Sequence, residues 1–155
     1  METRDEPDLE RIREAAFAPI FDSFRSMLGG ELYALTQERG DHEQAELLAS
    51  IIEAGSGWET FVAVLGVDVV GFVSIQLNRK IHVGEIGLNA VDPRHVGRGV
   101  GTAMYEHALG HMKEAGMRAA TVSTGGDPSH APARRAYQKA GFEVGIPSVW
   151  LCRTL

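Results

Sequence analysis

A glycine-rich turn joins a strand-like segment of this chain to a helix-like one. Residues 92–102 read Asp-Pro-Arg-His-Val-Gly-Arg-Gly-Val-Gly-Thr, with every second residue from Gly97 to Gly101 a glycine. Such glycines let the backbone approach a ligand without obstruction by Cβ atoms. The turn amides, the positive end of the following helix dipole, and Arg94 and Arg98 would together attract an anion. This pattern predicts a phosphate or pyrophosphate site. The alternative is that the glycines only permit tight packing of the strand against the helix.

Two common phosphate-binding motifs do not match this turn. A P-loop needs a lysine before its final Ser or Thr, and no lysine precedes Thr102. The dinucleotide fingerprint is G-x-G-x-x-G, whereas the glycines here follow G-x-G-x-G, and the chain is too short for six parallel strands. The turn alone therefore leaves its ligand open.

Length and composition predict one soluble domain spanning residues 1–155. The chain is 44% hydrophobic and 23% charged, which is typical of a globular protein, and it has no room for two domains of ordinary size. No apolar run approaches the roughly 20 residues of a membrane helix, and the acidic N-terminus resembles neither a secretory signal nor a transit peptide. The single cysteine, Cys152, cannot form an internal disulfide. We therefore expect a cytoplasmic protein without a membrane partner.

Charge is divided unevenly along the chain. Residues 1–60 carry 14 acidic and 5 basic side chains, whereas residues 61–155 carry 7 acidic and 10 basic ones. The segment 92–139, which contains the glycine turn, has 7 basic and 4 acidic side chains, although the whole chain has a net charge of −6. The overall charge argues against nucleic acid as a partner. Its division predicts an anionic ligand for one half of the chain and a cationic one for the other.

The hydrophobic period predicts an α/β fold in which helices flank one mixed sheet. The expected helices are 9–28, 41–54, 100–115 and 131–140, and the expected strands are 60–65, 69–77, 82–91, 119–123, 142–144 and 149–152. Pro19 should kink the first helix, Gly29-Gly30 should end it, and Asp41 should cap the second. The first few residues of the chain are also compatible with a short edge strand.

A second motif lies near the end of the chain. From His130 to Phe142 the spacing is H-x-x-A-x-x-x-Y-x-x-x-G-F, which puts Ala133 and Tyr137 on one face of a helix. Together with the glycine turn, the long helix and the strand that precede it, this motif resembles the GCN5-related N-acetyltransferase (GNAT) superfamily. The resemblance covers essentially the whole chain, and its specific part is the segment 85–142. It implies a single GNAT-like domain with a mixed, mostly antiparallel sheet.

The resemblance implies that the glycine turn binds the pyrophosphate of acetyl-CoA. The family has [QR]-x-x-G-x-[GA] here, and Val96 stands in the position of Gln or Arg. His130 stands where the family has an Asn that contacts the pantetheine end, and a histidine can also donate a hydrogen bond. A backbone N–H near Ala90 or Val91 would hold the thioester carbonyl, while Thr102 would cap the helix or contact phosphate. The cofactor-binding residues implied are Ala90, Val91, Val96, Gly97, Arg98, Gly99, Val100, Gly101, Thr102, His130 and Ala133.

The reaction implied is direct transfer of an acetyl group from acetyl-CoA to a primary amine. Tyr137 resembles the family tyrosine that protonates the departing thiolate, and its alternative role is that of a packed core residue. Glu85, in the strand before the turn, is the candidate base for the amine proton, directly or through water, and its alternative is a solvent-facing glutamate. The acetyl-CoA-binding core is expected at about residues 60–155.

The identity of the acceptor stays open at this stage. A small amine, an amino acid, a polyamine, an antibiotic or a protein amine would fit the family. The acidic helices of residues 9–54, which in the family border the acceptor site, favour a cationic acceptor. The rival hypotheses are a non-catalytic acyl-CoA-binding or sensing module and a small-nucleotide-binding protein.

Two histidines and two tryptophans are expected to have structural roles and not to bind a ligand. His107 and His111 have the i, i+4 spacing of zinc ligands, but no third ligand is evident, so we expect a solvated helix face and no metal. Trp58 and Trp150 flank predicted strands, and we expect them to pack in the core or in a homodimer rather than to stack on a ligand.

Overall fold

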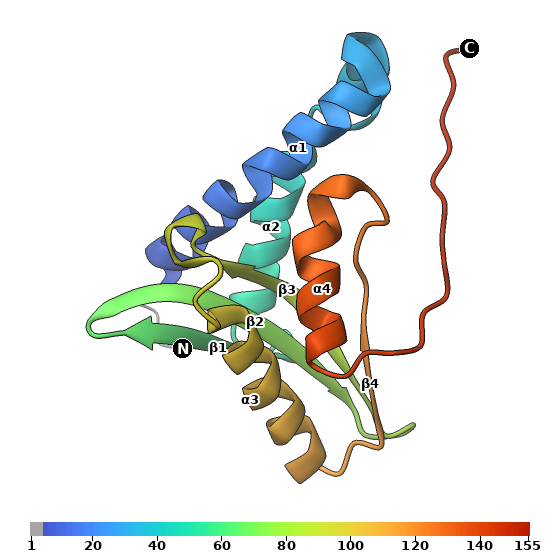
Figure 1. The fold of residues 1–155 in the computed structure, drawn as a ribbon. Helices are drawn as coiled ribbons and strands as arrows, with labels where there is room; N and C mark the ends of the chain where they lie inside the picture. Colours follow the sequence, from blue (N-terminus) through green and yellow to red (C-terminus); the bar gives the residue numbers. More distant parts are fainter. Residues whose placement is uncertain (1–4) are drawn as a thin grey trace.

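Within residues 5–155, which the computed structural model describes, a four-stranded sheet lies between two layers of helix (Figure 1). The strands are β1 (Trp58–Leu65), β2 (Asp68–Asn78), β3 (Val83–Val91) and β4 (Ala119–Val122), in the spatial order β1-β2-β3-β4. β1 pairs antiparallel with β2, β2 antiparallel with β3, and β3 parallel with β4. The expected mixed, mostly antiparallel sheet is therefore confirmed. The edge strand suggested for the first residues of the chain falls outside the described range.

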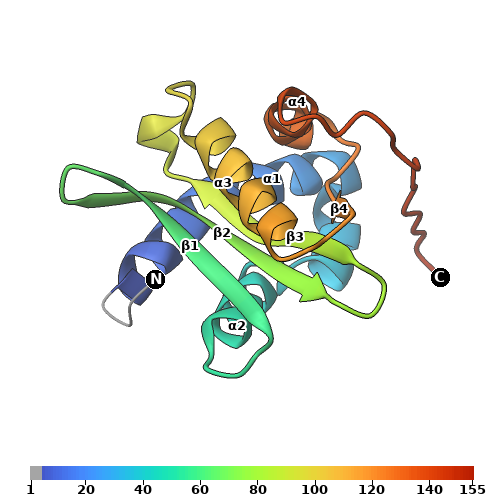
Figure 2. The ribbon, with the colours of Figure 1, turned by 90° about the horizontal axis from the view of Figure 1, so that it is seen from below.

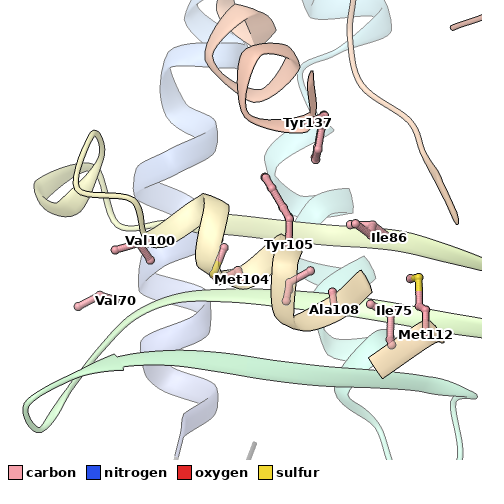
Figure 3. Close-up of a cluster of buried hydrophobic side chains, with 10 residues drawn as sticks. Val70, Ile75, Ile86, Val100, Met104, Tyr105, Ala108, Met112 and Tyr137 are labelled. Carbon is pink, nitrogen blue, oxygen red and sulfur yellow. The ribbon is translucent and has the colours of Figure 1, made fainter. Parts of the chain in front are cut away.

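Different helices cover the two faces of the sheet (Figure 2). The helices are α1 (Glu6–Thr36), α2 (Gly40–Ile52), α3 (Val100–Glu114) and α4 (Ala131–Lys139), with the short 3-10 turns η2 (Pro93–His95) and η3 (Pro128–His130). On one face, Leu9 and Ile12 of α1 pack with Phe72 of β2, and α2 joins the same core. On the other face lie α3 and α4, and Figure 3 shows Tyr105 and Tyr137 of this second core close to each other. None of the helices in residues 5–155 combines the length and apolarity needed to cross a lipid bilayer.

The first helix differs from the prediction at both of its expected breaks. α1 continues through Pro19 with helical backbone. Pro19 removes the partner of the Ala15 carbonyl, but both residues are exposed, so water can satisfy that carbonyl. The helix was expected to end at Gly29-Gly30, but it is only interrupted at Gly29 (φ 75°, ψ 168°) and resumes as far as Thr36.

The buried guanidinium of Arg13 joins the two N-terminal helices. Its Nη1 donates to Asp41 at 2.8 Å, and its Nε and Nη2 donate to Glu10. Arg13 is 1% exposed, and the hydrogen bonds to Glu10 and Asp41 raise its pKa above the ordinary value against the effect of burial. Because α2 begins at Gly40, Asp41 lies inside its first turn and does not cap it, so that expectation is wrong.

The two final strands expected at 142–144 and 149–152 do not form. Residues 142–155 are irregular, and the chain leads away from the base of α4 without joining the sheet (Figure 1). The alternation of apolar residues predicted strands, but a strand needs a neighbour for its backbone hydrogen bonds. This segment has no such neighbour in residues 5–141, and β4 is left as an edge strand.

A bulge in β3 sets which side chains face the site. Val73 of β2 pairs with Asn89, but Ile75 pairs with Ile86, so residues 87–88 of β3 form a bulge opposite a single residue of β2. The extra residue turns Ile86 and Asn89 to the same face, toward α3 and α4. In addition, β4 pairs only with the first four residues of β3, so among the described strands the rest of β3 lacks a neighbour on that side.

Candidate active site

Two buried tyrosines meet at Asn89 on the side of the sheet that α3 and α4 cover. Tyr105 comes from α3 and Tyr137 from α4, and their ring centroids are 4.9 Å apart (Figure 3). The Tyr105 hydroxyl donates to Asn89 Oδ1 at 2.8 Å, and Asn89 Nδ2 lies 3.1 Å from the Tyr137 hydroxyl. Asn89 Nδ2 also donates to the Gly87 carbonyl at 2.8 Å. The three side chains form one hydrogen-bonded unit.

The Tyr137 hydroxyl lies within hydrogen-bond distance of both amide atoms of Asn89, 3.1 Å from Nδ2 and 3.3 Å from Oδ1. Tyr105 is the closer of the two phenols to Asn89 Oδ1, at 2.8 Å against 3.3 Å for Tyr137. Asn89 Nδ2 can then donate to the Tyr137 oxygen, and Tyr137 can donate to a third group. Burial, together with the neighbouring Tyr137, raises the pKa of Tyr105 above its ordinary value, so Tyr105 keeps its proton and remains a donor to Asn89. A phenol held in this way is suited to protonate a leaving group.

Sequence reasoning missed both Asn89 and Tyr105. The available signal for Asn89 is its residue type, because asparagine is disfavoured in strands and this one stands among the apolar residues Leu88, Ala90 and Val91. Tyr105 has the spacing of a core residue of α3, and nothing in the sequence distinguishes it from its apolar neighbours.

Glu85 lies on β3 but outside this unit. It is exposed, and the next residue, Ile86, belongs to the core under α3 and α4. Because neighbouring residues of a strand point to opposite faces, Glu85 faces the side of α1 and α2. Its distance from Asn89 along the strand is roughly 13 Å. The structure does not bring the two candidate catalytic residues, Glu85 and Tyr137, into contact.

The glycine turn has the geometry of an anion-binding site. Gly97 and Gly99 have φ of 81° and 82°, and α3 begins directly after Gly99 without a side-chain cap. Backbone N–H groups in the first turn of a helix lack intrahelical partners, and here these belong to residues 100–102. Thr102 is thus the third residue of α3 and not its cap. The three amides and the exposed Arg98 suit a pyrophosphate.

Asp92 holds the base of the turn and ties it to α1. Asp92 is 1% exposed, and its carboxylate accepts hydrogen bonds from Arg94 Nη2 at 2.6 Å and from Arg11 Nη1 at 2.7 Å. It also accepts the backbone N–H of Arg94 and so caps η2. The hydrogen bonds from Arg94 and Arg11 hold the pKa of Asp92 well below its usual range, against the effect of burial. The charge of Arg94 is therefore paired with Asp92, although its side chain is 70% exposed, which leaves Arg98 better placed to bind a ligand.

At the start of α4, Asp127 and Phe24 fix the ring of His130. His130 Nδ1 lies 2.5 Å from Asp127 Oδ2, and the ring stacks on that of Phe24 with centroids 6.1 Å apart. Burial acts to raise the pKa of Asp127, but hydrogen bonds from Ser129 and His130 lower it below the ordinary value. Arg134 donates to the Asp127 carbonyl at 2.7 Å and braces the same loop. With Nδ1 engaged, Nε2 is the ring nitrogen that a ligand can approach.

The other residues implied for cofactor binding lie around these groups. Ala90 is buried in the core under α1 and α2, whereas Val91 packs on the opposite side. Val96 is exposed on the glycine turn. Ala133 packs on α4 against the same core as Tyr137.

An apolar cavity of about 250 Å³ lies between β1 and α3, with Phe61, Met104 and His107 in its lining. It contains none of the candidate catalytic residues. His111, one turn further along α3, lies 2.8 Å from a carboxylate oxygen of Glu59, and both histidine rings contact Phe61.

Residues 5–155 contain no group of three or more His, Cys, Asp or Glu side chains arranged to hold a metal ion.

A protein-family comparison identifies the class of this chain. The acetyltransferase (GNAT) family model matches residues 21–142, which include the glycine turn, Asn89 and the Tyr137 motif. The chain belongs to the acetyltransferase (GNAT) family, so the resemblance seen in the sequence is confirmed. Acetyl-CoA is accordingly its co-substrate. No curated protein matches the chain at a significant level.

Solved structures share the fold. The PaiA N-acetyltransferase from Thermoplasma acidophilum, in complex with coenzyme A, has 16% identity and a TM-score of 0.71 over 96% of this chain and 89% of that one. The IAA acetyltransferase from Bacillus cereus has 26% identity and a TM-score of 0.56 over 70% of this chain and 66% of that one. The ribosomal-protein-S18-alanine N-acetyltransferase from Escherichia coli has 20% identity and a TM-score of 0.56 over 66% and 62%. The match spans less than two thirds of the length of the last two proteins.

Proposed function

We propose that this protein transfers the acetyl group of acetyl-CoA directly to a primary amine. The observation that carries the proposal is the buried Tyr137 hydroxyl, which Asn89 holds beside the part of β3 that β4 leaves unpaired. Family membership supports acetyl-CoA as the donor. Two structural neighbours are named N-acetyltransferases, which supports an amine as the acceptor.

Acetyl-CoA supplies an acetyl group that is already activated as a thioester. Its pyrophosphate suits the glycine turn, and the amides of residues 100–102 and the Arg98 guanidinium are the groups proposed to bind it. Cβ atoms at Gly97 and Gly99 would meet nothing within 4 Å, so the protein itself does not crowd this side of the turn. His130 Nε2 and the backbone near Ala90 and Val91 are the groups proposed to contact the pantetheine and the thioester.

Tyr137 is the proposed acid that gives a proton to the departing sulfur. Its hydroxyl lies 3.3 Å from Asn89 Oδ1 and can turn its hydrogen to the sulfur instead, because Asn89 Nδ2, at 3.1 Å, then donates to the phenol oxygen. Once the proton has left, the Nδ2–H of Asn89 stabilises the negative charge on the phenol oxygen. Tyr137 is thus the proposed catalytic residue, and Asn89 is a positioning residue that acts through it.

Glu85 is the proposed final acceptor of the amine proton. An ammonium group has no lone pair, so the acceptor must lose a proton before it attacks the carbonyl. Glu85 stands roughly 13 Å along β3 from Asn89, which is too far for direct transfer near Tyr137. We therefore place water molecules between the amine and this exposed carboxylate.

The acceptor is proposed to be cationic. Glu31, Glu38 and Glu43 are exposed on the N-terminal helices and the link between them, whereas the Asp41 charge is paired with Arg13. The names of structural neighbours do not select an acceptor, because they range from IAA to a ribosomal protein. Since surface charges are screened by salt, kcat/KM for polyamines should fall severalfold as ionic strength rises. No salt dependence with cationic acceptors would overturn this part of the proposal.

A comparison of ligands tests the donor site. Acetyl-CoA and coenzyme A should raise the melting temperature of the protein, while ATP and NAD at equal concentration should not. A shift with ATP alone would contradict the proposal and favour a small-nucleotide-binding protein.

A further inference from the structure

The cavity of about 250 Å³ between β1 and α3 has no role in the proposed acetyl transfer. One side of it is formed by Phe61–Leu65 of β1, and the other by α3, where Ala103 and His107 are exposed. Buried core side chains form its floor, among them Val70 and Met104, which Figure 3 shows. The cavity therefore reaches from solvent down to the core.

Small residues explain why this space is not filled. Ala63 of β1 pairs opposite Gly71 of β2, and a Cβ at Gly71 would already lie 2.8 Å from Met104 Sδ. Met104 thus packs directly on the glycine, and Ala103, beside it on α3, is too short to cover the mouth. Protein cores normally pack with few voids larger than a water molecule, so an open apolar space of this size is suited to a ligand.

Among the described residues that line the cavity, His107 is the one polar side chain. Its ring packs against that of Phe61, with centroids 4.8 Å apart and an interplanar angle of 76°. Within residues 5–155 its ring nitrogens have no hydrogen-bond or ion-pair partner, whereas His111, one turn later, is paired with Glu59. A neutral imidazole offers one donor and one acceptor, so His107 can bind one polar group of a ligand at the mouth.

The size and lining of the cavity define the class of ligand. Its volume of about 250 Å³ is below the roughly 300–1,000 Å³ of pockets for drug-sized ligands, so it suits a molecule of one or two rings. An aromatic ring can meet the Phe61 ring edge to face and the Met104 sulfur at its own edge, and both contacts add to the burial of apolar surface. The described lining contains no arginine or lysine, so a phosphate group would lose its hydration here without gaining a partner.

We propose that this cavity binds a small aromatic molecule with one hydrogen-bonding group, such as a phenol or an indole. The ring of the ligand packs on Phe61 and Met104, and its polar group bonds to His107 at the mouth. This is a second ligand site, separate from the candidate active site, because the lining includes neither Asn89 nor the two tyrosines that meet it.

NMR of the full chain, labelled in its methionine methyl groups and titrated with phenol, tests the proposal. The methyl signal of Met104 should shift and saturate. Met112, two turns further along α3, packs on Gly84 and should not shift. Cyclohexanol, which has the same hydroxyl but no aromatic ring, should bind clearly more weakly. No saturable shift of Met104, equal shifts of both methionines, or equal binding of cyclohexanol would each overturn the proposal.

Variants locate the ring and the polar group of the ligand. Ala103→Trp, at an exposed position, should fill the mouth and abolish binding, while Glu106→Trp, exposed on the same helix but outside the lining, should leave it unchanged. An unchanged Met112 signal shows that each variant is folded. His107→Ala should weaken phenol binding severalfold and leave the affinity for toluene, which has no polar group, at the wild-type value.

Two results of these variants would contradict the proposal. Full binding of phenol to Ala103→Trp would place the site outside the cavity. An equal loss of affinity for phenol and toluene in His107→Ala would show that the histidine only packs against the ligand.

Discussion

The Asn89 amide nitrogen lies 3.1 Å from the Tyr137 hydroxyl, while the oxygen of the same amide accepts the Tyr105 hydroxyl at 2.8 Å. One amide thus distinguishes two neighbouring phenols, because it accepts from one and donates to the other. The two hydroxyls consequently have different roles, although both rings belong to one buried core. The Tyr137 hydroxyl also lies 3.3 Å from that amide oxygen, but Tyr137 is the phenol that receives the amide N–H, which would stabilise its phenolate after proton transfer.

Tyr137→Phe should lower the rate of acetyl transfer by about 100-fold or more, since proton transfer by a positioned side chain contributes about that much. Acetyl-CoA affinity should change little, because the ring and its packing remain. Steady-state kinetics and calorimetric titration measure the two effects. Tyr33→Phe, which removes a hydroxyl from another buried tyrosine, is the control and should keep full turnover. Unchanged turnover in Tyr137→Phe would remove this residue from the mechanism.

Asn89→Ala should reduce both turnover and stability. The loss leaves two buried hydroxyls without their partner, so the free energy of unfolding should fall by about 1–3 kcal/mol in a denaturant titration. The same substitution at Asn78, exposed at the end of β2, should cost clearly less. If kcat stayed at the wild-type level while stability fell, Asn89 would be a structural residue without a positioning role.

Glu85→Gln tests the route of the amine proton. A base works only when deprotonated, so the rate should rise with pH on the acidic limb of the wild-type profile, and this limb should be altered in the variant. Because we expect water between the carboxylate and the amine, the loss at neutral pH should be smaller than for Tyr137→Phe. A profile that superimposes on that of wild type would exclude Glu85 as the base.

Arg98→Ala should weaken acetyl-CoA binding by about 10-fold or more without destabilising the fold, because the exposed Arg98 guanidinium is proposed to bind the pyrophosphate through a charge-assisted hydrogen bond. Arg39→Ala, which removes an exposed guanidinium from the link between α1 and α2, is the matched control and should leave affinity unchanged. Calorimetric titration with acetyl-CoA measures both. Equal affinities in the two variants would contradict the assigned phosphate site.

Asp92→Asn should lower the free energy of unfolding at pH 7 by about 1–3 kcal/mol, a moderate value because both arginine partners are partly exposed. The pKa of Asp92 is lowered in the folded protein, so its contribution is complete above the unfolded pKa of about 3.9 and is lost as the pH falls further. The difference between wild type and variant should therefore shrink below about pH 4. A constant difference from pH 7 to pH 2 in denaturant titrations would contradict this account.

Local patterns in the sequence predicted most of the elements. The hairpin between β1 and β2 and the helix after the glycine turn follow from apolar period and turn glycines, which act over a few residues. The effect of Pro19 was not predictable in the same way, because it depends on whether water reaches the Ala15 carbonyl. The irregular end of the chain differs from its strand pattern although β4 has an unpaired edge, because docking on an edge depends on contacts outside the segment's own sequence.

The candidate site was predictable only where its residues are close in sequence. The glycine turn is continuous, and its positive φ values follow from residue type. The contact of Asn89 with Tyr105 and Tyr137 joins three elements and depends on a bulge at 87–88 that no local pattern reveals. Spacing along β3 also could not show that Glu85 lies on the opposite face from Tyr137.

Release of free thiol from acetyl-CoA, followed with and without a panel of mono- and polyamines, is the most direct test of acetyl transfer by this protein. We expect release that depends on the amine, an acetylated amine formed in equal amount, and loss of both in Tyr137→Phe. Tight binding of acetyl-CoA without amine-dependent thiol release for any acceptor would contradict it and would identify a non-catalytic acyl-CoA-binding module.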